Sequence, residues 1–382
     1  MNIIFLLNIQ DLCIIHCAVK RVCAMNNSLE YLLVDEFRQT LDRIPGGAVY
    51  QVERESPLDR FRVDAVVKAT LRDSEATFVI ECKRSGFPRD VRAAIYQLHS
   101  YLSQTGDLGS DIVPVIASEA LSDGAMNLLK EEGVGYFDLD GNLFLPGKSF
   151  YVLIEKPRSD KKRKITSSIF KGKRARALHA VWLAGDAWFS VGEIADRAGV
   201  SAGTASETLT SLEEREWVAT RGQGPSKERM LKSRTELLDA WSDACRAIKP
   251  PATRRYYMKN GTPQSIMQMI DDVSERNGWQ YEITGEAAAQ LYSPYLSTVS
   301  QVRCRLNILD RIDLAEHYDL RPTSQGWNLS ILYPEADGDL PFRTFRDGVW
   351  FADELQTYFD LLQAGGRAKD FAAHLRQEIL KA

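Results

Sequence analysis

Residues 78–86, FVIECKRSG, end a predicted strand in two charged side chains whose types and spacing could do chemistry. Glu81 and Lys83 stand two positions apart, so they share one face of the strand, while Cys82 points to the other. Taken alone, such a pair most often marks a strand that reaches solvent, where Glu and Lys are ordinary. A catalytic interpretation requires further groups that the fold brings to the same place.

The preceding strand supplies one such group, Asp64. The runs FRVDAVVKAT (61–70) and TFVIECKR (77–84), joined by LRDSEA, predict an antiparallel hairpin. With the loop at 71–76, Asp64 lies opposite Lys83, and a one-residue change in the turn sets it opposite Glu81. In both registers the strands lie about 5 Å apart here, so the three side chains converge if they share a face.

Two carboxylates and an ammonium group are the parts needed for metal-assisted phosphodiester hydrolysis. Asp64 and Glu81 offer hard oxygen ligands to Mg²⁺ or Mn²⁺, which would keep most of its waters. Lys83 could orient or deprotonate one such water, and it could stabilise negative charge on a phosphate.

These residues resemble the PD-(D/E)xK nuclease superfamily, which has the restriction-endonuclease fold. Its pattern of an Asp on one strand and E-x-K on the next reads RVD and ECK here, with Val63 at the nominal proline. On the following predicted helix, Gln97 and Tyr101 in QLHSY fit the Q-x-x-x-Y motif of the RecB-like branch. Glu36 lies on the first predicted helix, where that superfamily often supplies another acidic residue.

The resemblance implies a role for each residue. The implied metal ligands are Asp64, Glu81 and Glu36. Lys83 would assist catalysis, and Gln97 and Tyr101 would sit beside the DNA. Each also has an ordinary alternative as a surface carboxylate or a helix-face residue, and a chain can keep this fold only to bind DNA.

An α/β domain of the restriction-endonuclease-like class, over residues 25–155, would position these groups. Apolar residues at helical spacing in 28–44 predict a first helix, which PGG at 45–47 ends. After the hairpin, the pattern predicts a helix at 89–104, then a strand, a helix, a strand and a further hairpin at DGN. Residues 1–24 do not form a secretory signal, because Asp11 interrupts their apolar part, and we expect a non-structural extension.

Residues 156–173 form a basic linker between this domain and the next. From 156 to 176 the chain has ten Lys or Arg against one Asp, although its net charge is only −4. Phosphate neutralisation dominates the affinity of proteins for DNA, so this tract predicts contacts with a DNA backbone. The predicted contact residues are Lys161, Lys162, Arg163, Lys164, Lys173, Arg174 and Arg176.

Residues 174–248 resemble the winged helix-turn-helix domain of bacterial regulators. Gly199 breaks between two short predicted helices, and the recognition helix is expected near 202–215. Short polar groups near the start of such a helix reach phosphates and bases, and here these are Ser201, Thr204, Ser206 and Thr208. The run WVATRGQGPSKERML has the strand, turn and strand of a wing, whose predicted backbone contacts are Arg221, Lys227 and Arg229. Winged helices also serve as protein-interaction domains, so that alternative stays open.

Size and composition place the chain among cytoplasmic, multidomain proteins. A chain of 382 residues exceeds what one core usually serves, so two or three domains are expected. The longest apolar runs are far shorter than the roughly 20 residues of a membrane span, so no membrane partner is predicted. Beyond residue 24 the cysteines Cys82, Cys245 and Cys304 have neither metal-ligand nor disulfide spacing, which suits a reducing compartment.

The pattern of residues 252–382 predicts an α+β C-terminal domain without a catalytic constellation. The ending LQTYFDLLQAGGRAKDFAAHLR, with GVGYFDLDGN upstream of a winged helix, looks like AbiEi-type proteins, the antitoxins of type IV toxin–antitoxin systems. In that family the winged helix represses the operon and a C-terminal domain opposes a nucleotidyltransferase toxin. A nuclease-like domain before the winged helix departs from the usual antitoxin. TRRYYMK at 253–259 could bind DNA or RNA, or it could be a strand edge.

Two functions therefore compete. In the first, the chain is a Mg²⁺-dependent DNA endonuclease that its winged helix directs to double-stranded DNA. In the second, it is a transcriptional repressor and antitoxin whose nuclease-like fold is a non-cleaving scaffold, with a nucleotidyltransferase-like toxin as partner. Symmetric DNA sites would go with a homodimer.

Overall fold

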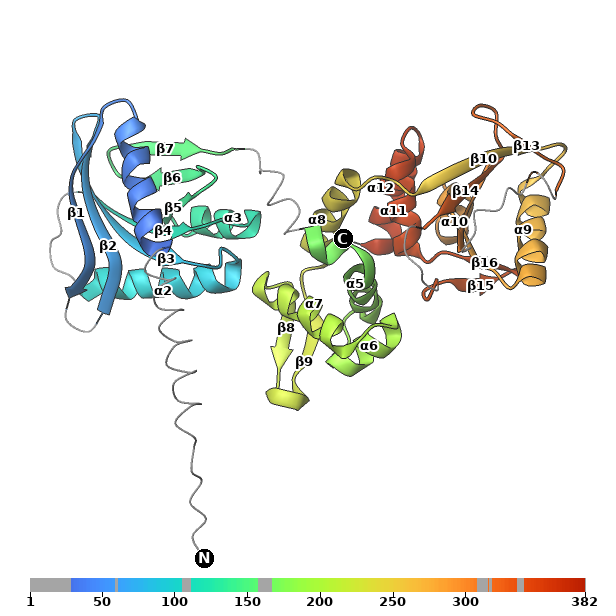
Figure 1. Cartoon of the computed structure of the whole chain (residues 1–382), viewed down its shortest axis with the longest axis horizontal. Coiled ribbons are helices and arrows are strands. Elements are labelled where there is room, and N and C mark those ends of the chain that lie inside the picture. The colour runs from blue at the N-terminus through green and yellow to red at the C-terminus, as the bar shows by residue number, and fades with distance from the viewer. Residues whose placement is uncertain are drawn as a thin grey trace, which may run out of the picture. The chain divides into compact units, whose positions relative to one another are not determined.

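The computed structural model describes residues 29–58, 61–104, 111–156, 167–307, 315, 318–334 and 340–381. The predicted extension at 1–24 and the basic residues 161–164 lie outside this part of the chain. The chain forms two compact units, whose described parts begin at residue 29 and at residue 167 (Figure 1). Among the described helices, none has the length and apolar character needed to cross a bilayer.

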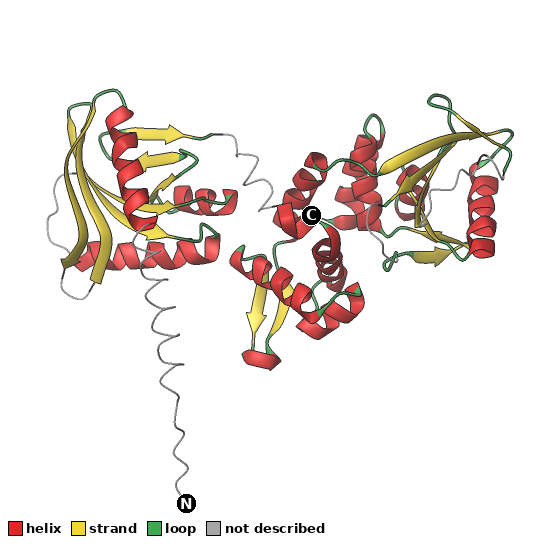
Figure 2. Ribbon diagram, in the orientation of Figure 1, coloured by secondary structure: helices red, strands yellow, loops and turns green. Residues whose placement is uncertain are grey.

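The first unit is a seven-stranded mixed sheet with helices on both faces (Figure 2). Its strands follow chain order; β3, β4 and β5 are parallel, and the other neighbours are antiparallel. The strands are β1 (Gly47–Leu58), β2 (Phe61–Leu71), β3 (Ser74–Lys83), β4 (Ile112–Ser118), β5 (Gly135–Asp138), β6 (Leu143–Pro146) and β7 (Tyr151–Ile154). A helix at 29–43 packs on one face, and α2 (Pro88–Gln104) and α3 (Asp123–Glu131) pack on the other.

Alternation along β3 separates two hydrophobic cores and aims the charged residues. Ile80 packs with Phe37 of the helix at 29–43, whereas Val79 belongs to the core under α2. Glu81 and Lys83 continue the row of Val79. The sheet therefore directs both charges to the α2 side, just beyond the last buried residue of that row.

The mixed α/β fold predicted for this unit is confirmed, and one strand is an addition. β1 was not predicted because Glu53 and Arg54 interrupt its apolar pattern. It pairs only with β2, at the edge of the sheet, where charged side chains are common and discourage pairing with another chain.

The second unit begins with helices and a two-stranded hairpin in the order of a winged helix-turn-helix. The elements are η1 (Ser167–Phe170), α5 (Gly172–Ala184), α6 (Val191–Ala198), α7 (Ala202–Glu214), β8 (Val218–Arg221), η2 (Gly224–Ser226) and β9 (Glu228–Leu231). Helix α8 (Arg234–Ala247) follows them. The predicted helices and wing strands are all present, and we call Ser167–Leu231 the α5–β9 region.

A seven-stranded mixed sheet forms the rest of this unit, in the order β13-β10-β14-β12-β11-β16-β15. Its strands are β10 (Ala252–Met258), β11 (Gln280–Thr284), β12 (Val302–Asn307), β13 (Leu320–Pro322), β14 (Leu329–Tyr333), β15 (Thr344–Arg346) and β16 (Val349–Phe351). Helix α9 (Pro263–Asn277) packs on one face. The other helices are α10 (Gly285–Tyr292), α11 (Glu354–Ala364) and α12 (Ala368–Leu375), followed by a π-helical turn, η4 (Arg376–Leu380).

One hydrophobic core spans the boundary predicted between residues 248 and 252. Leu355 of α11 and Phe371 of α12 belong to the same core as Leu178 of α5 and Leu209 of α7. His179 on α5 also lies with Nε2 2.6 Å from a carboxylate oxygen of Asp353, which caps the N-terminus of α11. The last helices thus complete the core of the α5–β9 region. The sheet has a separate core with α9.

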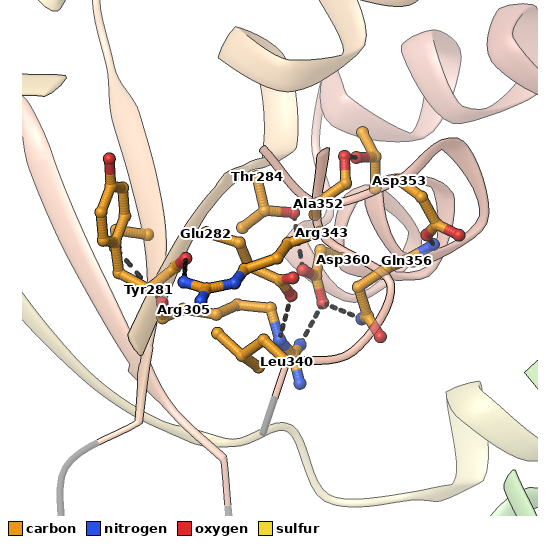
Figure 3. A network of polar contacts seen from close by, with 12 residues as sticks. Tyr281, Glu282, Thr284, Arg305, Leu340, Arg343, Ala352, Asp353, Gln356 and Asp360 are labelled. Atoms are coloured by element: carbon orange, nitrogen blue, oxygen red, sulfur yellow. Dashed lines mark hydrogen bonds and ion pairs between the residues drawn. The ribbon is translucent and has the colours of Figure 1, made fainter. Parts of the chain in front are cut away.

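A buried polar network fastens α11 to the sheet (Figure 3). Asp360 of α11 accepts hydrogen bonds from Arg305 Nη1 at 2.7 Å and from the Thr284 hydroxyl at 2.6 Å. Arg305 also lies 3.3 Å from Glu282 on the neighbouring strand. Glu282 and Asp360 therefore share the Arg305 guanidinium in the interior, and Arg343 adds a second positive charge that acts on Glu282.

We expect Glu282→Gln to remove a pH dependence of stability in this unit. Burial raises the pKa of Glu282 to about 8 from 4.5, against the opposing pull of Arg305. Between these values the folded chain holds a proton that the unfolded chain has released, so stability falls as pH rises. Each pKa unit corresponds to about 1.4 kcal/mol.

The measurement is the melting temperature of the second unit in the full chain between pH 4.5 and 8. The matched control is Glu236→Gln, which neutralises an exposed carboxylate on α8. A slope of melting temperature against pH that is equal in wild type and Glu282→Gln would contradict the prediction.

Candidate functional site

The β2–β3 hairpin has a tighter turn than the sequence suggested, and this turn fixes the register of the site. Arg72 and Asp73 form it, both with positive φ (46° and 68°), as in the tight turns that suit twisted hairpins. Pairing runs from Leu71 opposite Ser74 to Ala65 opposite Ile80. The predicted loop at 71–76 was too long, and the alternative register, with Asp64 opposite Glu81, is the one observed.

Four of the predicted residues come together at this end of the hairpin. The Cys82 backbone N–H donates to Asp64 Oδ2 at 2.6 Å. Lys83 Nζ donates to Glu81 Oε1 at 2.7 Å and to Gln97 Oε1 of α2 at 3.1 Å. Asp64, Glu81, Lys83 and Gln97 therefore form one polar cluster, which we call the hairpin site.

The hairpin site holds more negative charge than its surroundings stabilise. Burial raises the pKa of Glu81, and the nearby carboxylate of Asp64 raises it further, although Lys83 opposes both effects. The Glu81 side chain is only 12% exposed, so water compensates little of this charge. A divalent cation would relieve the repulsion, and two carboxylates suit Mg²⁺ or Mn²⁺, which keep several waters. The residues present therefore fit the predicted metal.

The first helix contributes a different acidic residue from the one predicted. Glu30 acts electrostatically on Glu81 and Cys82, whereas Glu36 does not appear among the charges that affect them. Within the described part of the chain, no three His, Cys, Asp or Glu side chains are grouped so that they could hold a metal. The prediction of Glu36 as a third ligand therefore has no geometric support within the described part of the chain.

Tyr101 does not lie where the nuclease resemblance put it. Its side chain is 2% exposed and packs in the core with Leu98 and Val79. Gln97, one turn earlier on α2, is exposed and contacts Lys83. The Q-x-x-x-Y pair is therefore split, because Gln97 belongs to the hairpin site while Tyr101 supports α2 and cannot reach a nucleic acid.

The start of α7 is held by the short polar residues that were expected to contact DNA. Ser201 Oγ accepts from the Thr204 backbone N–H at 3.2 Å and lies 3.0 Å from the Thr204 hydroxyl. Ser201 is exposed, and Thr204 and Ser206 are half-buried. Thr208 is fully buried and donates to the Thr204 carbonyl, so the expectation that it faces out is wrong.

The charged residues of the wing are largely engaged with other side chains. Arg229 is 6% exposed and lies 2.9 Å from Glu213 of α7, which also pairs with Lys227 at 2.6 Å. Arg229 therefore joins the wing to α7, and its predicted backbone contact is corrected to a structural role. Arg221 is exposed, pairs with Glu228 and stacks on Trp188. It remains the wing residue best placed to meet a phosphate.

The described end of the basic tract lies against the same helices. Lys173 is exposed, and Arg174 pairs with Glu207 of α7, whose side chain is 64% exposed. The Arg176 side chain lies against Gly199, in the turn between α6 and α7. The contact is so close that a Cβ atom at position 199 would lie 2.8 Å from Arg176 Nη2. These three residues of α5 thus place positive charge beside α7.

Replacing Arg174 and Arg176 together by Gln should weaken binding to double-stranded DNA and flatten its salt dependence. Each phosphate contact contributes about 0.9 to the slope of log affinity against log salt, so the slope should fall by about 2. The measurement is fluorescence anisotropy on a labelled duplex at several salt concentrations.

The matched control is Arg246→Gln with Arg276→Gln, which removes the same charge from exposed positions on α8 and α9. A salt slope equal to that of the wild type would exclude Arg174 and Arg176 from the interface.

The sequence matches no protein-family model, and it matches no curated protein. Among solved structures, a repair endonuclease from Pyrococcus abyssi is 21% identical, with a TM-score of 0.23; the match covers 30% of this chain and 46% of that one. A complex of EndoMS with double-stranded DNA is 24% identical, with a TM-score of 0.22, covering 30% and 44%. Reduced HlyU from Vibrio cholerae is 25% identical, with a TM-score of 0.17, covering 23% and 93%. The chain thus spans less than half of either endonuclease, and similarities at this level carry no functional argument. The resemblance of residues 174–382 to AbiEi-type antitoxins stays a prediction.

Proposed function

We propose that the first unit is a Mg²⁺-dependent DNA nuclease and that the α5–β9 region binds double-stranded DNA. The observation that carries the proposal is the hairpin site. Asp64 lies close enough to Glu81 to act on its charge, burial and this repulsion raise the pKa of Glu81, and Lys83 links Glu81 to Gln97. Two carboxylates held close together at the end of a strand repel each other, so this arrangement does not serve the stability of the fold.

Each residue of the hairpin site has a task in phosphodiester hydrolysis. Asp64 and Glu81 would hold the metal, which when bound lowers the pKa of a coordinated water and polarises the phosphate. The Cys82 N–H fixes the orientation of Asp64. The Lys83 ammonium, positioned by Glu81 and Gln97, can stabilise negative charge that develops on the phosphate.

Delivery of DNA would fall to the second unit. The exposed Ser201 directly precedes helix α7, and α5 places Lys173, Arg174 and Arg176 beside it. Short polar groups at a helix start and adjacent cations are what a major-groove helix and its backbone contacts require.

The test is incubation of supercoiled and linear DNA with the full chain in Mg²⁺, Mn²⁺ or EDTA, with binding of the same DNA measured in parallel. Cleavage with either metal and none in EDTA is the expected result. Tight binding without cutting in all three conditions would refute the nuclease proposal. It would favour the repressor, in which the nuclease-like fold is a scaffold.

A further inference from the structure

On the face of the C-terminal sheet opposite α9, Arg305 is paired with Glu282 and Asp360, whereas Arg255 and Arg303 form no ion pair among the described residues. Arg255 of β10 and Arg303 of β12 lie directly across from Ser330 of β14, one on each side. Tyr256, the residue after Arg255, and both sequence neighbours of Ser330 and Arg303 belong to the core shared with α9. Because side chains alternate along a strand, Arg255, Ser330 and Arg303 point to the opposite face of the sheet, on the adjacent strands β10, β14 and β12. Figure 1 shows where these strands lie.

Trp327 holds both arginines in place. Cζ of Arg303 lies 4.9 Å from the centre of the indole ring, and Cζ of Arg255 lies 5.6 Å from it. Stacking occupies the flat face of a guanidinium and leaves its N–H edges available to oxygen acceptors. Within the described residues neither guanidinium has an ion pair. Two carboxylates act on Arg303 electrostatically, and both are held by other groups: Glu286 by Arg367 at 3.0 and 3.1 Å, and Asp360 by Arg305 and Thr284.

Ser330 lies between the two cations and lacks a partner of its own. Its residue is fully buried, and among the described groups its hydroxyl has no hydrogen-bond partner. A buried hydroxyl without a partner costs stability, and so do two like charges held near each other. Burial lowers the pKa of Arg303, and the Arg255 charge acts in the same direction. A phosphate would relieve both costs, because its oxygens accept hydrogen bonds from the hydroxyl and from both guanidinium groups.

The same face continues into an exposed aromatic residue. Tyr257 is 42% exposed and lies two residues beyond Arg255 on β10, opposite Arg321 of β13. Cations beside an exposed ring are how proteins hold unpaired nucleotides, with phosphates on the cations and a base on the ring. A duplex keeps its bases stacked inside, so it cannot place one on Tyr257.

We propose that this sheet face binds single-stranded nucleic acid, with a phosphate between Arg255 and Arg303 against Ser330 and a base on Tyr257. This inference goes beyond the proposed nuclease function and does not depend on it, because these residues belong neither to the hairpin site nor to the α5–β9 region.

The test is the anisotropy of a labelled oligothymidylate of about 12 nucleotides, a length that suits one single-strand site, with a duplex of equal length alongside. The full chain is used in EDTA, so that cleavage plays no part. Tyr257→Ala should weaken oligothymidylate binding about tenfold. Arg255→Gln should reduce the salt slope by about 0.7. Duplex binding should be unchanged in both variants.

Two further variants distinguish binding at these specific residues from nonspecific attraction of the nucleic acid to positive charge. Arg276→Gln removes one charge from α9 on the opposite face, where the side chain is 69% exposed, and should leave oligothymidylate binding unchanged. Ser330→Ala should weaken binding about threefold while the melting temperature holds or rises, because the lost hydroxyl had no partner.

Several outcomes would overturn the proposal. They are wild-type affinity for oligothymidylate in Tyr257→Ala and Arg255→Gln, an equal loss in Arg276→Gln, or an equal loss of duplex binding. A lower melting temperature in Ser330→Ala with unchanged affinity would likewise remove Ser330 from the site.

Discussion

Glu81→Gln should abolish metal-dependent cleavage and, at the same time, stabilise the first unit. Removing a metal-binding carboxylate is expected to slow the reaction on the order of 10³-fold, or about 4 kcal/mol of barrier. The stability change has the opposite sign because burial and Asp64 raise the pKa of Glu81. Such a carboxyl contributes stability while protonated, and this contribution is lost as pH rises. At neutral pH the neutral amide should therefore raise the melting temperature of the first unit.

The measurements are cleavage rate in Mg²⁺ and melting temperature in EDTA, both on the full chain. The matched control is Glu75→Gln, which removes the same charge from an exposed position on the same face of β3 and should change neither quantity. Cleavage at the wild-type rate would exclude Glu81 from the site. A lower melting temperature would show that its contact with Lys83 serves the fold.

Arg305→Met should cause the largest loss of stability in the second unit. The substitution leaves Glu282 and Asp360 buried beside each other with no cation between them. Breaking a buried ion pair from one side costs about 3–5 kcal/mol, because an uncompensated charge stays in the interior. We expect an early unfolding transition of this unit in urea, with the first unit unaffected.

The carboxylates themselves provide the test of this cause. Adding Glu282→Gln and Asp360→Asn to Arg305→Met should recover most of the loss, since both carboxylates that Arg305 compensated are then neutral. The control Arg246→Met removes an arginine whose surface ion pair on α8 is worth at most about 1 kcal/mol. If the triple variant is no more stable than Arg305→Met alone, packing of the long side chain, and not charge, explains the loss.

Much of the hairpin site could be predicted because strand periodicity and chain order fix it. Asp64, Glu81 and Lys83 share a face through alternation, and only the turn length was open. Leu33, Val34 and Phe37 face the sheet on the Ile80 side, so helical spacing sets Glu30 on the stripe that faces the sheet and Glu36 to the side of that stripe.

Other errors arose where a residue was assigned a DNA contact from a motif although the spacing of its apolar neighbours already predicted burial. Tyr101 follows Leu98 at helical spacing, so its burial agrees with the pattern of α2. Arg229 and Leu231 are two residues apart on β9 and share its buried face, so the Arg229 charge lies beneath the wing. What no pattern could supply was the pairing between distant segments, such as Arg229 with Glu213, or Arg255 and Arg303 on either side of Ser330.

The core shared by the α5–β9 region and the last helices bears on how mutant alleles should be interpreted. A nonsense allele that stops before α11 removes Leu355 and Phe371, and with them part of the packing around Leu178 and Trp241. If the α5–β9 region binds DNA as proposed, a strain with such an allele would lose that binding without a lesion in any residue that contacts DNA. Deletion mapping would then assign every phenotype to the C-terminus, and only point substitutions outside the shared core could separate the functions genetically.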